Sequence, residues 1–162
     1  WLFEMDSQKV DIVVHPQSII HSMVEFDDTS VKAQLGLPDM KIPIQYALSY
    51  PNHIKTNWEP LDLVKIKSLT FESVNYERFP CIKLAYEALA RGGTSSSVLN
   101  VANEQAVYRF LKKEIGFMEI PKLIEIAMEN HDWTEDPSID DILSLEDWTT
   151  NFVKSFSSKY IK

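Results

Sequence analysis

The segment of residues 11–40, DIVVHPQSIIHSMVEFDDTSVKAQLGLPDM, contains the side chains best placed for chemistry. Ser18 and His21 fall where a predicted strand ends, and Pro38 and Met40 follow a predicted hairpin. Ligands of open α/β sheets usually bind outside the carboxyl ends of the strands, so a hydroxyl and an imidazole there could orient a ligand. A lone Ser or His at such a place is also often only a turn residue. The residue types alone leave both interpretations open.

Other familiar catalytic patterns are missing from the sequence. Its four glycines, at positions 36, 92, 93 and 116, form no phosphate-binding loop and no dinucleotide fingerprint. No Gly-x-Ser-x-Gly elbow surrounds Ser18, so a hydrolase that uses Ser18 and His21 is the weakest of the function hypotheses. His15 and His21 stand six residues apart across Pro16, and no HxxxH or HExxH pattern occurs, so we predict no metal site.

The composition excludes several classes of function. The 24 acidic residues exceed the 16 basic ones and give a net charge of −8, which argues against nonspecific nucleic-acid binding. The single cysteine, Cys81, excludes an internal disulfide, fits a reducing compartment and is expected to be a buried structural residue. No apolar run approaches the ~18 residues of a membrane span, and no signal peptide is present. We therefore predict a soluble cytoplasmic protein.

The elements that must position Ser18 and His21 are predicted within residues 1–75. Residues 1–8, WLFEMDSQ, suggest the end of a helix whose start lies upstream, and residues 10–15 suggest a central strand buried on both faces. Residues 18–26 and 30–36 flank Asp27-Asp28-Thr29 and predict a hairpin with one buried face. A short helix with Pro43 in its first turn follows. Residues 51–75 predict an extended linker that packs through Trp58, Leu61 and Phe71, with short strands near VKIK and LTFE.

Residues 76–162 predict a compact domain of four helices. The first helix ends at Gly92-Gly93, the second runs from the cap residues 94–97 to about residue 113, and the third covers 119–130. The last begins at Ser144, which forms a capping-box pattern with Asp147. The inward-facing residues are predicted to be Ile82, Ala85, Tyr86 and Leu89 in the first helix, Ile120, Leu123, Ile124, Ala127 and Met128 in the third, and Leu145, Trp148, Phe152, Phe156 and Tyr160 in the last.

Three polar residues share one face of the second predicted helix. Asn100, Asn103 and Glu104 follow the i, i+3, i+4 spacing on a largely apolar helix. A solvated face is the simplest explanation and a ligand contact the least favoured. We predict a buried polar cluster that ties a neighbouring segment, which requires that all its hydrogen bonds are satisfied.

Five motifs together resemble one enzyme family. HPQSIIHSMV, AQLGLPDMKIPIQYAL, WEPLDL, FPCIKLAYEA and LNVANEQAV are similar to segments of the 1-deoxy-D-xylulose 5-phosphate reductoisomerases, and the similarity spans the whole chain. The most specific of them are HPQS-x-IHSMV and GxPDM. The resemblance implies an α+β chain in which residues 1–50 end an α/β catalytic domain, 51–75 form a linker and 76–162 form the C-terminal helical domain.

The resemblance also implies a function for the complete enzyme. That family reduces and isomerises 1-deoxy-D-xylulose 5-phosphate to 2-C-methyl-D-erythritol 4-phosphate in non-mevalonate isoprenoid biosynthesis, with NADPH and Mg²⁺ or Mn²⁺, as homodimers. Ser18, His21, Pro38 and Met40 match positions that line the substrate and nicotinamide pocket, where they shape and orient. The family's NADPH domain and metal carboxylates lie upstream of residue 1.

The chain is therefore expected to be a C-terminal portion of that reductoisomerase. No catalytic residue and no metal ligand of the family can be placed on this sequence, and no cofactor is expected to bind to this chain alone. Without the cation that polarises the substrate oxygens, we expect the chain alone to be inactive. The alternative is a non-catalytic helical interaction module derived from that enzyme, and neither interpretation involves nucleic acid or a membrane.

Overall fold

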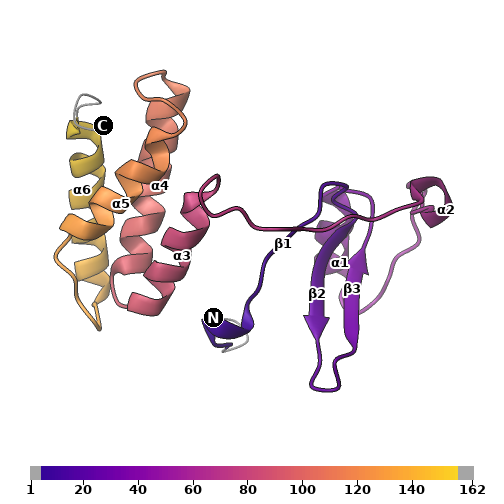
Figure 1. The fold of residues 1–162 in the computed structure, drawn as a ribbon. Helices are drawn as coiled ribbons and strands as arrows, with labels where there is room; N and C mark the ends of the chain where they lie inside the picture. Colours follow the sequence, from indigo (N-terminus) through magenta and orange to yellow (C-terminus); the bar gives the residue numbers. More distant parts are fainter. Residues whose placement is uncertain (1–4, 157–162) are drawn as a thin grey trace. The chain divides into compact units, whose positions relative to one another are not determined.

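A computed structural model describes residues 5–156 of the chain, which divides into two compact units (Figure 1). One unit is Ile12–Val74. The other combines the N-terminal segment up to Asp11 with the chain from Asn75 onward. The strands belong to the first unit and the long helices to the second, so the predicted α+β class is confirmed.

Two small antiparallel sheets form the strand-containing unit. In the first, β1 (Val13–Val14) pairs with β4 (Glu72–Ser73), and Val13 lies opposite Ser73. In the second, β2 (Ile20–Glu25) pairs with β3 (Val31–Leu35) as the predicted hairpin. Asp28 closes its turn by accepting hydrogen bonds from the amide and hydroxyl of Ser30, which lower the pKa of Asp28. The confirmed hairpin thus depends on local turn chemistry.

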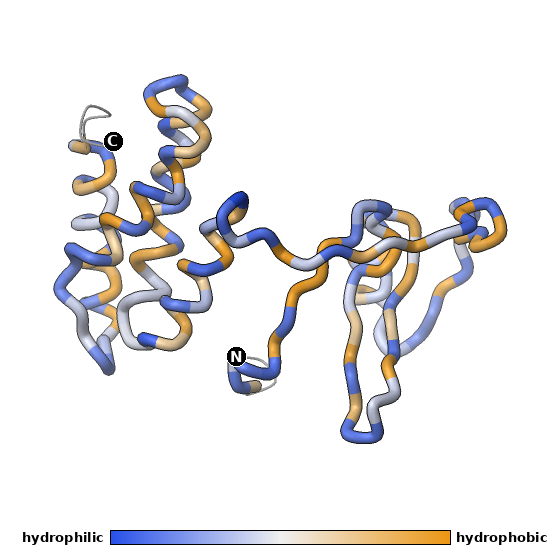
Figure 2. Tube along the Cα trace, in the orientation of Figure 1, coloured by the Kyte–Doolittle hydropathy of each residue, from blue (hydrophilic) through white to orange (hydrophobic). Residues whose placement is uncertain are grey.

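The burial that we predicted for these strands is wrong. The expected central strand at 10–15 has only two residues in strand conformation, and Val13 is 48 % exposed. Residues 21–34 of the hairpin are all exposed, although hydrophobic positions are interspersed with hydrophilic ones along both strands (Figure 2). An apolar strand becomes buried only where another layer covers it, and nothing within the described residues covers this hairpin.

Helix α1 (Lys41–Ser49) follows the hairpin and has Pro43 in its first turn, as predicted. The amide of Lys41 donates to the Asp39 carboxylate at 2.9 Å, and the Lys41 ammonium lies 2.9 Å from the same group. These contacts, the backbone one first, lower the pKa of Asp39. The Lys41 ammonium also lies 5.7 Å from the ring centroid of Trp58, so the start of α1 and the following segment are in contact.

The predicted linker contains one helical turn and one short strand. Residues Leu63–Ile66 form α2, so the strand expected near VKIK is wrong. The Asp62 carboxylate accepts hydrogen bonds from the amides of Val64 and Lys65, and this N-cap explains the helical turn. The strand expected near LTFE is β4, at Glu72–Ser73.

Within residues 5–156, the helical unit has a short 3₁₀ helix and four long helices. Ser7–Lys9 form the 3₁₀ helix η1, and Asp6 before it is extended. The end of an α-helix predicted for residues 1–8 is therefore wrong for residues 6–8. Residues 1–4 lie outside the described part of the chain. The long helices are α3 (Pro80–Arg91), α4 (Ser95–Leu111), α5 (Glu119–Asn130) and α6 (Ile139–Ser155). They confirm the predicted four-helix domain and the limits of its second and third helices.

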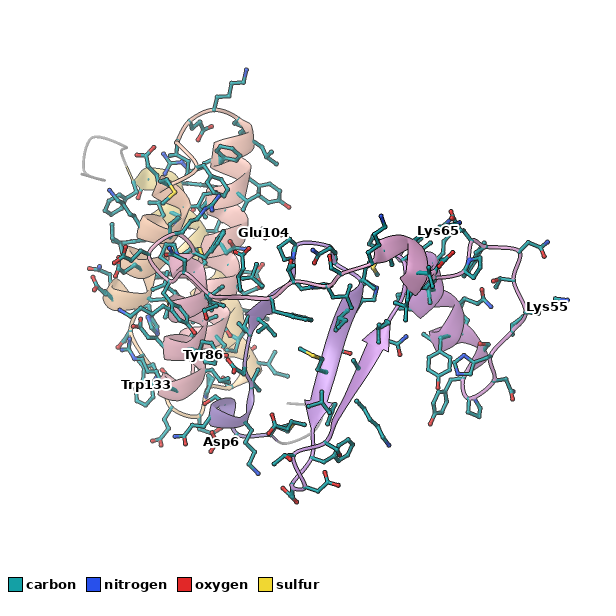
Figure 3. All side chains as sticks on the ribbon, turned by 45° about the vertical axis from the view of Figure 1, so that its right-hand side comes forward. Asp6, Lys55, Lys65, Tyr86, Glu104 and Trp133 are labelled. Carbon is teal, nitrogen blue, oxygen red and sulfur yellow. The ribbon has the colours of Figure 1, made fainter. Side chains whose placement is uncertain are left out.

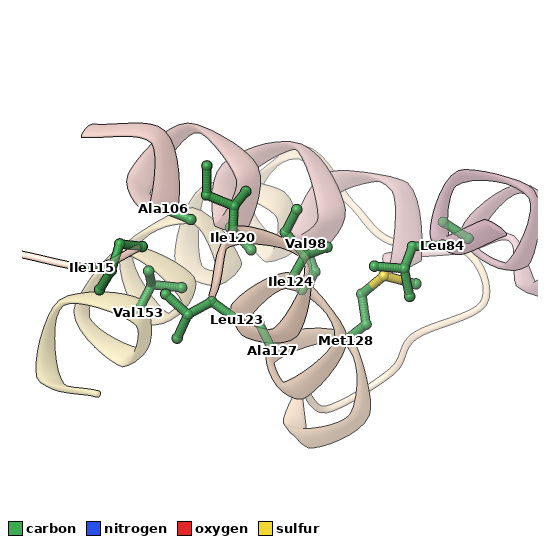
Figure 4. Packing of buried hydrophobic residues seen from close by; sticks show 12 residues of the cluster. Leu84, Val98, Ala106, Ile115, Ile120, Leu123, Ile124, Ala127, Met128 and Val153 are labelled. Carbon is green, nitrogen blue, oxygen red and sulfur yellow. The ribbon is translucent and has the colours of Figure 1, made fainter. Parts of the chain in front are cut away.

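The hydrophobic core lies between these four helices (Figure 4). Leu123 and Ile124 of α5 contribute its largest buried side chains, and small residues of α4, Ala102 and Ala106, are fully buried against the core. The small side chains let α4 and α5 approach closely. The core consists of Leu84, Ala88, Val98, Ala102, Ala106, Ile115, Ile120, Leu123, Ile124, Ala127, Met128 and Val153. The five inward residues predicted for the third helix are all among them.

Two features of α3 and α6 differ from the prediction. The buried residues of α3 are Leu84 and Ala88, not the stripe that includes Ala85 and Leu89, which are exposed. Both stripes follow a helical period, so the sequence pattern could not choose the buried face. Helix α6 begins five residues earlier than predicted, because Ser138 and Asp141 form the capping box. Leu145, Phe152 and Phe156 pack against the core as expected, whereas Tyr160 lies outside the described residues.

Several polar side chains of the helical unit also lie elsewhere than predicted. Asn100, Asn103 and Glu104 are exposed, so the buried polar cluster is wrong and the face is solvated. Glu104 lies at the surface of α4 and accepts a hydrogen bond from the Tyr108 hydroxyl (Figure 3). Cys81 is exposed in the first turn of α3, contrary to the expected buried position, although partial burial still raises the pKa of its thiol.

Candidate functional site

The corner formed by His15, Pro16, Gln17 and Ser18 joins β1 to β2. The amide of Ser18 donates to the carbonyl of His15 at 3.0 Å, which closes the turn. Ser18 itself has a φ of 51°, in the left-handed region that non-glycine residues rarely adopt. Such a conformation persists only where the surroundings over-determine it. The direction of the exposed Ser18 side chain therefore depends on what holds the corner.

A segment more than fifty residues away in sequence holds this corner. The Gln17 amide nitrogen donates to Thr70 Oγ1 at 2.8 Å, and the Thr70 backbone amide donates to Gln17 Oε1 at 3.1 Å. His15 Nδ1 lies 2.8 Å from the Thr70 carbonyl and must be the donor, because a carbonyl only accepts. The His15 ring stacks on Phe71 with centroids 4.9 Å apart. These contacts hold the turn at His15 and at Gln17.

His21 occupies an irregularity in the hairpin. Ile20 pairs with Leu35 and Ser22 pairs with Gln34, so His21 is an extra residue on β2. Such a bulge redirects a side chain and is common beside active sites. The ring of His21 is directed toward Gly36, since a Cβ on Gly36 would lie 3.6 Å from His21 Nε2. The structure thus brings His21 next to the start of the LPDM loop.

Pro38 and Met40 lie on the exposed loop between β3 and α1. Met40 is 70 % exposed and is the N-cap residue of α1, where its carbonyl accepts a hydrogen bond from the Ile44 amide. The Met40 thioether therefore adds apolar surface to the molecule, and the start of α1 fixes the Met40 backbone. The structure brings the His21 ring next to Gly36, two residues before Pro38. Ser18 lies three residues before His21, and the buried Ile19 follows it.

No metal site is formed by the described part of the chain. Residues 5–156 contain no group of three or more His, Cys, Asp or Glu side chains that could hold an ion. His15 already uses Nδ1 for the Thr70 carbonyl, and its Nε2 is enclosed. Within residues 5–156, no helix is both long enough and apolar enough to cross a membrane.

Sequence reasoning missed two residues of this site. Gln17 stands within the HPQS motif but carries no catalytic chemistry, and Thr70 lies in the segment predicted as a linker. Phe71 was predicted to pack on a neighbour, and it stacks on His15. The LTFE strand prediction was the one signal that this segment pairs with another strand. Its partner, β1, could not be identified from one sequence, because pairing over more than fifty residues has no local signature.

Comparison with known proteins gives a consistent result. The family model described as the C-terminal domain of DXP reductoisomerase matches residues 35–152. The chain is 53 % identical to the 1-deoxy-D-xylulose 5-phosphate reductoisomerase of Acetivibrio thermocellus over 95 % of the chain and 40 % of that protein. The Chloroherpeton thalassium protein of the same name is 54 % identical over 94 % of the chain and 40 % of its own length. The chain thus spans about two fifths of the length of these relatives.

Solved structures are similar over the same extent. The Zymomonas mobilis 1-deoxy-D-xylulose 5-phosphate reductoisomerase in complex with NADPH matches 95 % of this chain and 41 % of its own, with 41 % identity and a TM-score of 0.87. A DOX-P reductoisomerase in complex with NADPH, fosmidomycin and magnesium matches 95 % of this chain and 40 % of its own, with 35 % identity and a TM-score of 0.88.

Proposed function

Because this chain belongs to the 1-deoxy-D-xylulose 5-phosphate reductoisomerase family, we propose that it forms the C-terminal portion of an enzyme with that activity. The complete enzyme would convert 1-deoxy-D-xylulose 5-phosphate to 2-C-methyl-D-erythritol 4-phosphate in non-mevalonate isoprenoid biosynthesis. NADPH would supply the hydride, and Mg²⁺ or Mn²⁺ would polarise the substrate oxygens. The observation that carries the proposal is the similarity of 95 % of the chain to a structure that contains NADPH, fosmidomycin and magnesium.

The proposed contribution of this chain is one wall of the substrate and nicotinamide pocket. The Ser18 hydroxyl and the His21 imidazole are exposed and supply hydrogen-bonding groups that suit the oxygens of a sugar phosphate. Pro38 and Met40 supply apolar surface that a nicotinamide ring would cover. The described residues do not fit a divalent ion, so the metal ligands are assigned to the part of the enzyme that this chain does not span.

We propose the domain assignment, the quaternary state and the location on the same basis. Residues 1–50 would end the catalytic domain, 51–75 would form the linker and 76–162 the C-terminal domain. The complete enzyme would be a cytoplasmic homodimer, and the single cysteine fits a reducing compartment. Light scattering on a complete enzyme that carries this chain is expected to give twice the protomer mass, and a monomer would contradict the dimer.

A chimeric enzyme tests the proposed activity directly. This chain replaces the matching C-terminal two fifths of the Acetivibrio thermocellus relative. With 1-deoxy-D-xylulose 5-phosphate, NADPH and Mg²⁺, the chimera is expected to oxidise NADPH, measured by the loss of absorbance at about 340 nm. The 162-residue chain alone and the chimera with EDTA are the controls and are expected to be inactive.

Substitutions at the pocket wall extend this test. Ser18→Ala and His21→Ala are each expected to lower kcat/KM by about tenfold to a hundredfold, the usual effect of losing a hydrogen bond to a charged or reacting group. A folded chimera that binds NADPH but has no activity would contradict the proposed function and favour the non-catalytic interaction module.

A further inference from the structure

We infer that Gln17 and Thr70 are positioning residues of the reductoisomerase reaction, acting through the direction of Ser18. The inference rests on the proposed function, since it presumes that Ser18 faces the substrate. It places the end of the segment 51–75 in the support of the pocket wall, although that segment was predicted only as a linker. Neither Gln17 nor Thr70 needs to touch substrate or cofactor in this role.

Gln17 and Thr70 are joined by three hydrogen bonds. Gln17 Nε2 donates to Thr70 Oγ1 at 2.8 Å, and the Thr70 backbone amide and hydroxyl both approach Gln17 Oε1, at 3.1 and 3.2 Å. Both ends of the Gln17 amide are therefore used on one residue. A primary amide oriented in this way has one permitted direction, so the backbone at position 17 is fixed from outside the turn.

Ser18, the residue after Gln17, has a strained backbone conformation. Ser18 has a φ of 51° and follows directly after Gln17. A serine at this angle relaxes to negative φ unless its neighbours prevent it. On one side Gln17 is held by Thr70, and on the other Ile19 is buried and its carbonyl accepts the Gly36 amide at 3.0 Å. Removal of the Gln17 contacts leaves the Ser18–His15 backbone hydrogen bond and the Ile19 side in place, but it releases the support at Gln17 and lets the Ser18 hydroxyl turn.

Thr70 and the residues that follow it are themselves held in place by contacts with residues 13–15. The Thr70 carbonyl accepts from His15 Nδ1, and Phe71 stacks on the His15 ring. Two residues later, Ser73 pairs with Val13 in the β1–β4 sheet. Thr70 is therefore held by contacts other than those with Gln17, and it can in turn hold Gln17. Strand β4 begins two residues after Thr70.

The decisive experiment uses the active chimera and three variants. Gln17→Ala removes every contact of the Gln17 amide, Thr70→Val removes only the hydroxyl, and Thr70→Ser keeps the hydroxyl. Gln17→Ala is expected to lower kcat by about tenfold to a hundredfold, the loss typical of a misplaced substrate-orienting group. Thr70→Val is expected to lower kcat by about twofold to tenfold, a smaller loss, because the Thr70 backbone amide still donates to Gln17 Oε1. Thr70→Ser is expected to have the wild-type kcat.

A matched control separates positioning from stability. Gln45 donates its side-chain amide to the Ile54 carbonyl at 3.1 Å in the same unit, away from the corner. Gln45→Ala, which removes one side-chain hydrogen bond, should lower the melting temperature less than Gln17→Ala and leave kcat unchanged. In Gln17→Ala the KM for the sugar phosphate should stay unchanged while kcat falls, because the misdirected hydroxyl is needed in the transition state.

Each outcome of these measurements decides the question. A Gln17→Ala chimera that melts earlier but keeps its kcat would reduce the contact to a structural tie and overturn the inference. If Gln17→Ala does not fold, the comparison of Thr70→Val with Thr70→Ser decides in its place, and equal kcat values overturn the inference. An inactive wild-type chimera contradicts the proposed function instead, so the two failures are distinguishable.

Discussion

The turn between α3 and α4 allows a strong test of the packing in the helical unit. Gly92 and Gly93 both have positive φ, of 67° and 54°. A Cβ on Gly93 would overlap the Thr134 carbonyl oxygen, whereas a Cβ on Gly92 would meet nothing within 4 Å. Gly93→Ala therefore combines backbone strain with a clash against backbone, and Gly92→Ala has the strain alone.

The cost of Gly93→Ala follows from the contacts that must move. The Thr134 carbonyl accepts from the Thr94 amide at 3.0 Å, and the Thr134 amide donates to Thr94 Oγ1 at 3.1 Å. Trp133 Nε1 also donates to the Gly92 carbonyl at 3.2 Å. Loss of these three hydrogen bonds costs about 2–4 kcal/mol. Left-handed strain adds about 1–2 kcal/mol, so the free energy of unfolding should fall by about 4 kcal/mol.

The matched variant Gly92→Ala is expected to cost about half as much. Gly92 has a ψ of −158°, in a region used almost only by glycine, and an alanine there costs about 1–3 kcal/mol. Urea unfolding of the 162-residue chain, followed by circular dichroism at about 222 nm, measures both variants through the linear dependence of the unfolding free energy on denaturant. If Gly93→Ala costs no more than Gly92→Ala, the close approach of Thr134 to the turn is wrong.

Two further predictions concern the same helical unit. Leu123 is fully buried, so Leu123→Ala should lower the free energy of unfolding by about 2–5 kcal/mol. Leu111 is 68 % exposed, so Leu111→Ala should change it by about 0.5 kcal/mol or less. Equal losses in urea unfolding would show that Leu123 does not lie in the core. His131 donates Nδ1–H to the Met128 carbonyl, and burial, with a smaller effect of Arg91, lowers its pKa from the ordinary 6.5. The unfolded chain then takes up the proton more readily, so this contribution to stability is complete above pH 6.5 and falls as the pH drops below it. In urea titrations between about pH 7.5 and 5.5, His131→Gln should reduce that decline, and an unchanged decline would assign it to other groups.

Local patterns predicted the helical unit well and failed where two local patterns competed. The limits of α4 and α5 follow from cap residues and an unbroken helical period, which act within a few residues. The start of α6 was wrong because Ser138–Asp141 and Ser144–Asp147 both fit a capping box, and only the fold shows which serine is at the end of the helix. The buried face of α3 was wrong for the same reason, since two stripes have a helical period.

The candidate site divides along similar lines. The HPQS and LPDM motifs were recognisable because they are short and contiguous, and the hairpin between them follows from its turn residues. The bulge at His21 and the left-handed Ser18 could not be predicted, since both depend on pairing partners in other strands. The burial expected for the strands was wrong because alternation shows which residues can face a layer, not whether a layer is there.

The sequence by itself determined the family, the α+β class and the four helices of the C-terminal unit, because each depends on motifs or periods a few residues long. Only the tertiary structure decided that Thr70 holds Gln17 and that Thr134 closes over Gly93. Gln17 and Thr70 are 53 positions apart, and Thr94 and Thr134 are 40 apart, and such pairs form only when the chain closes the intervening loop.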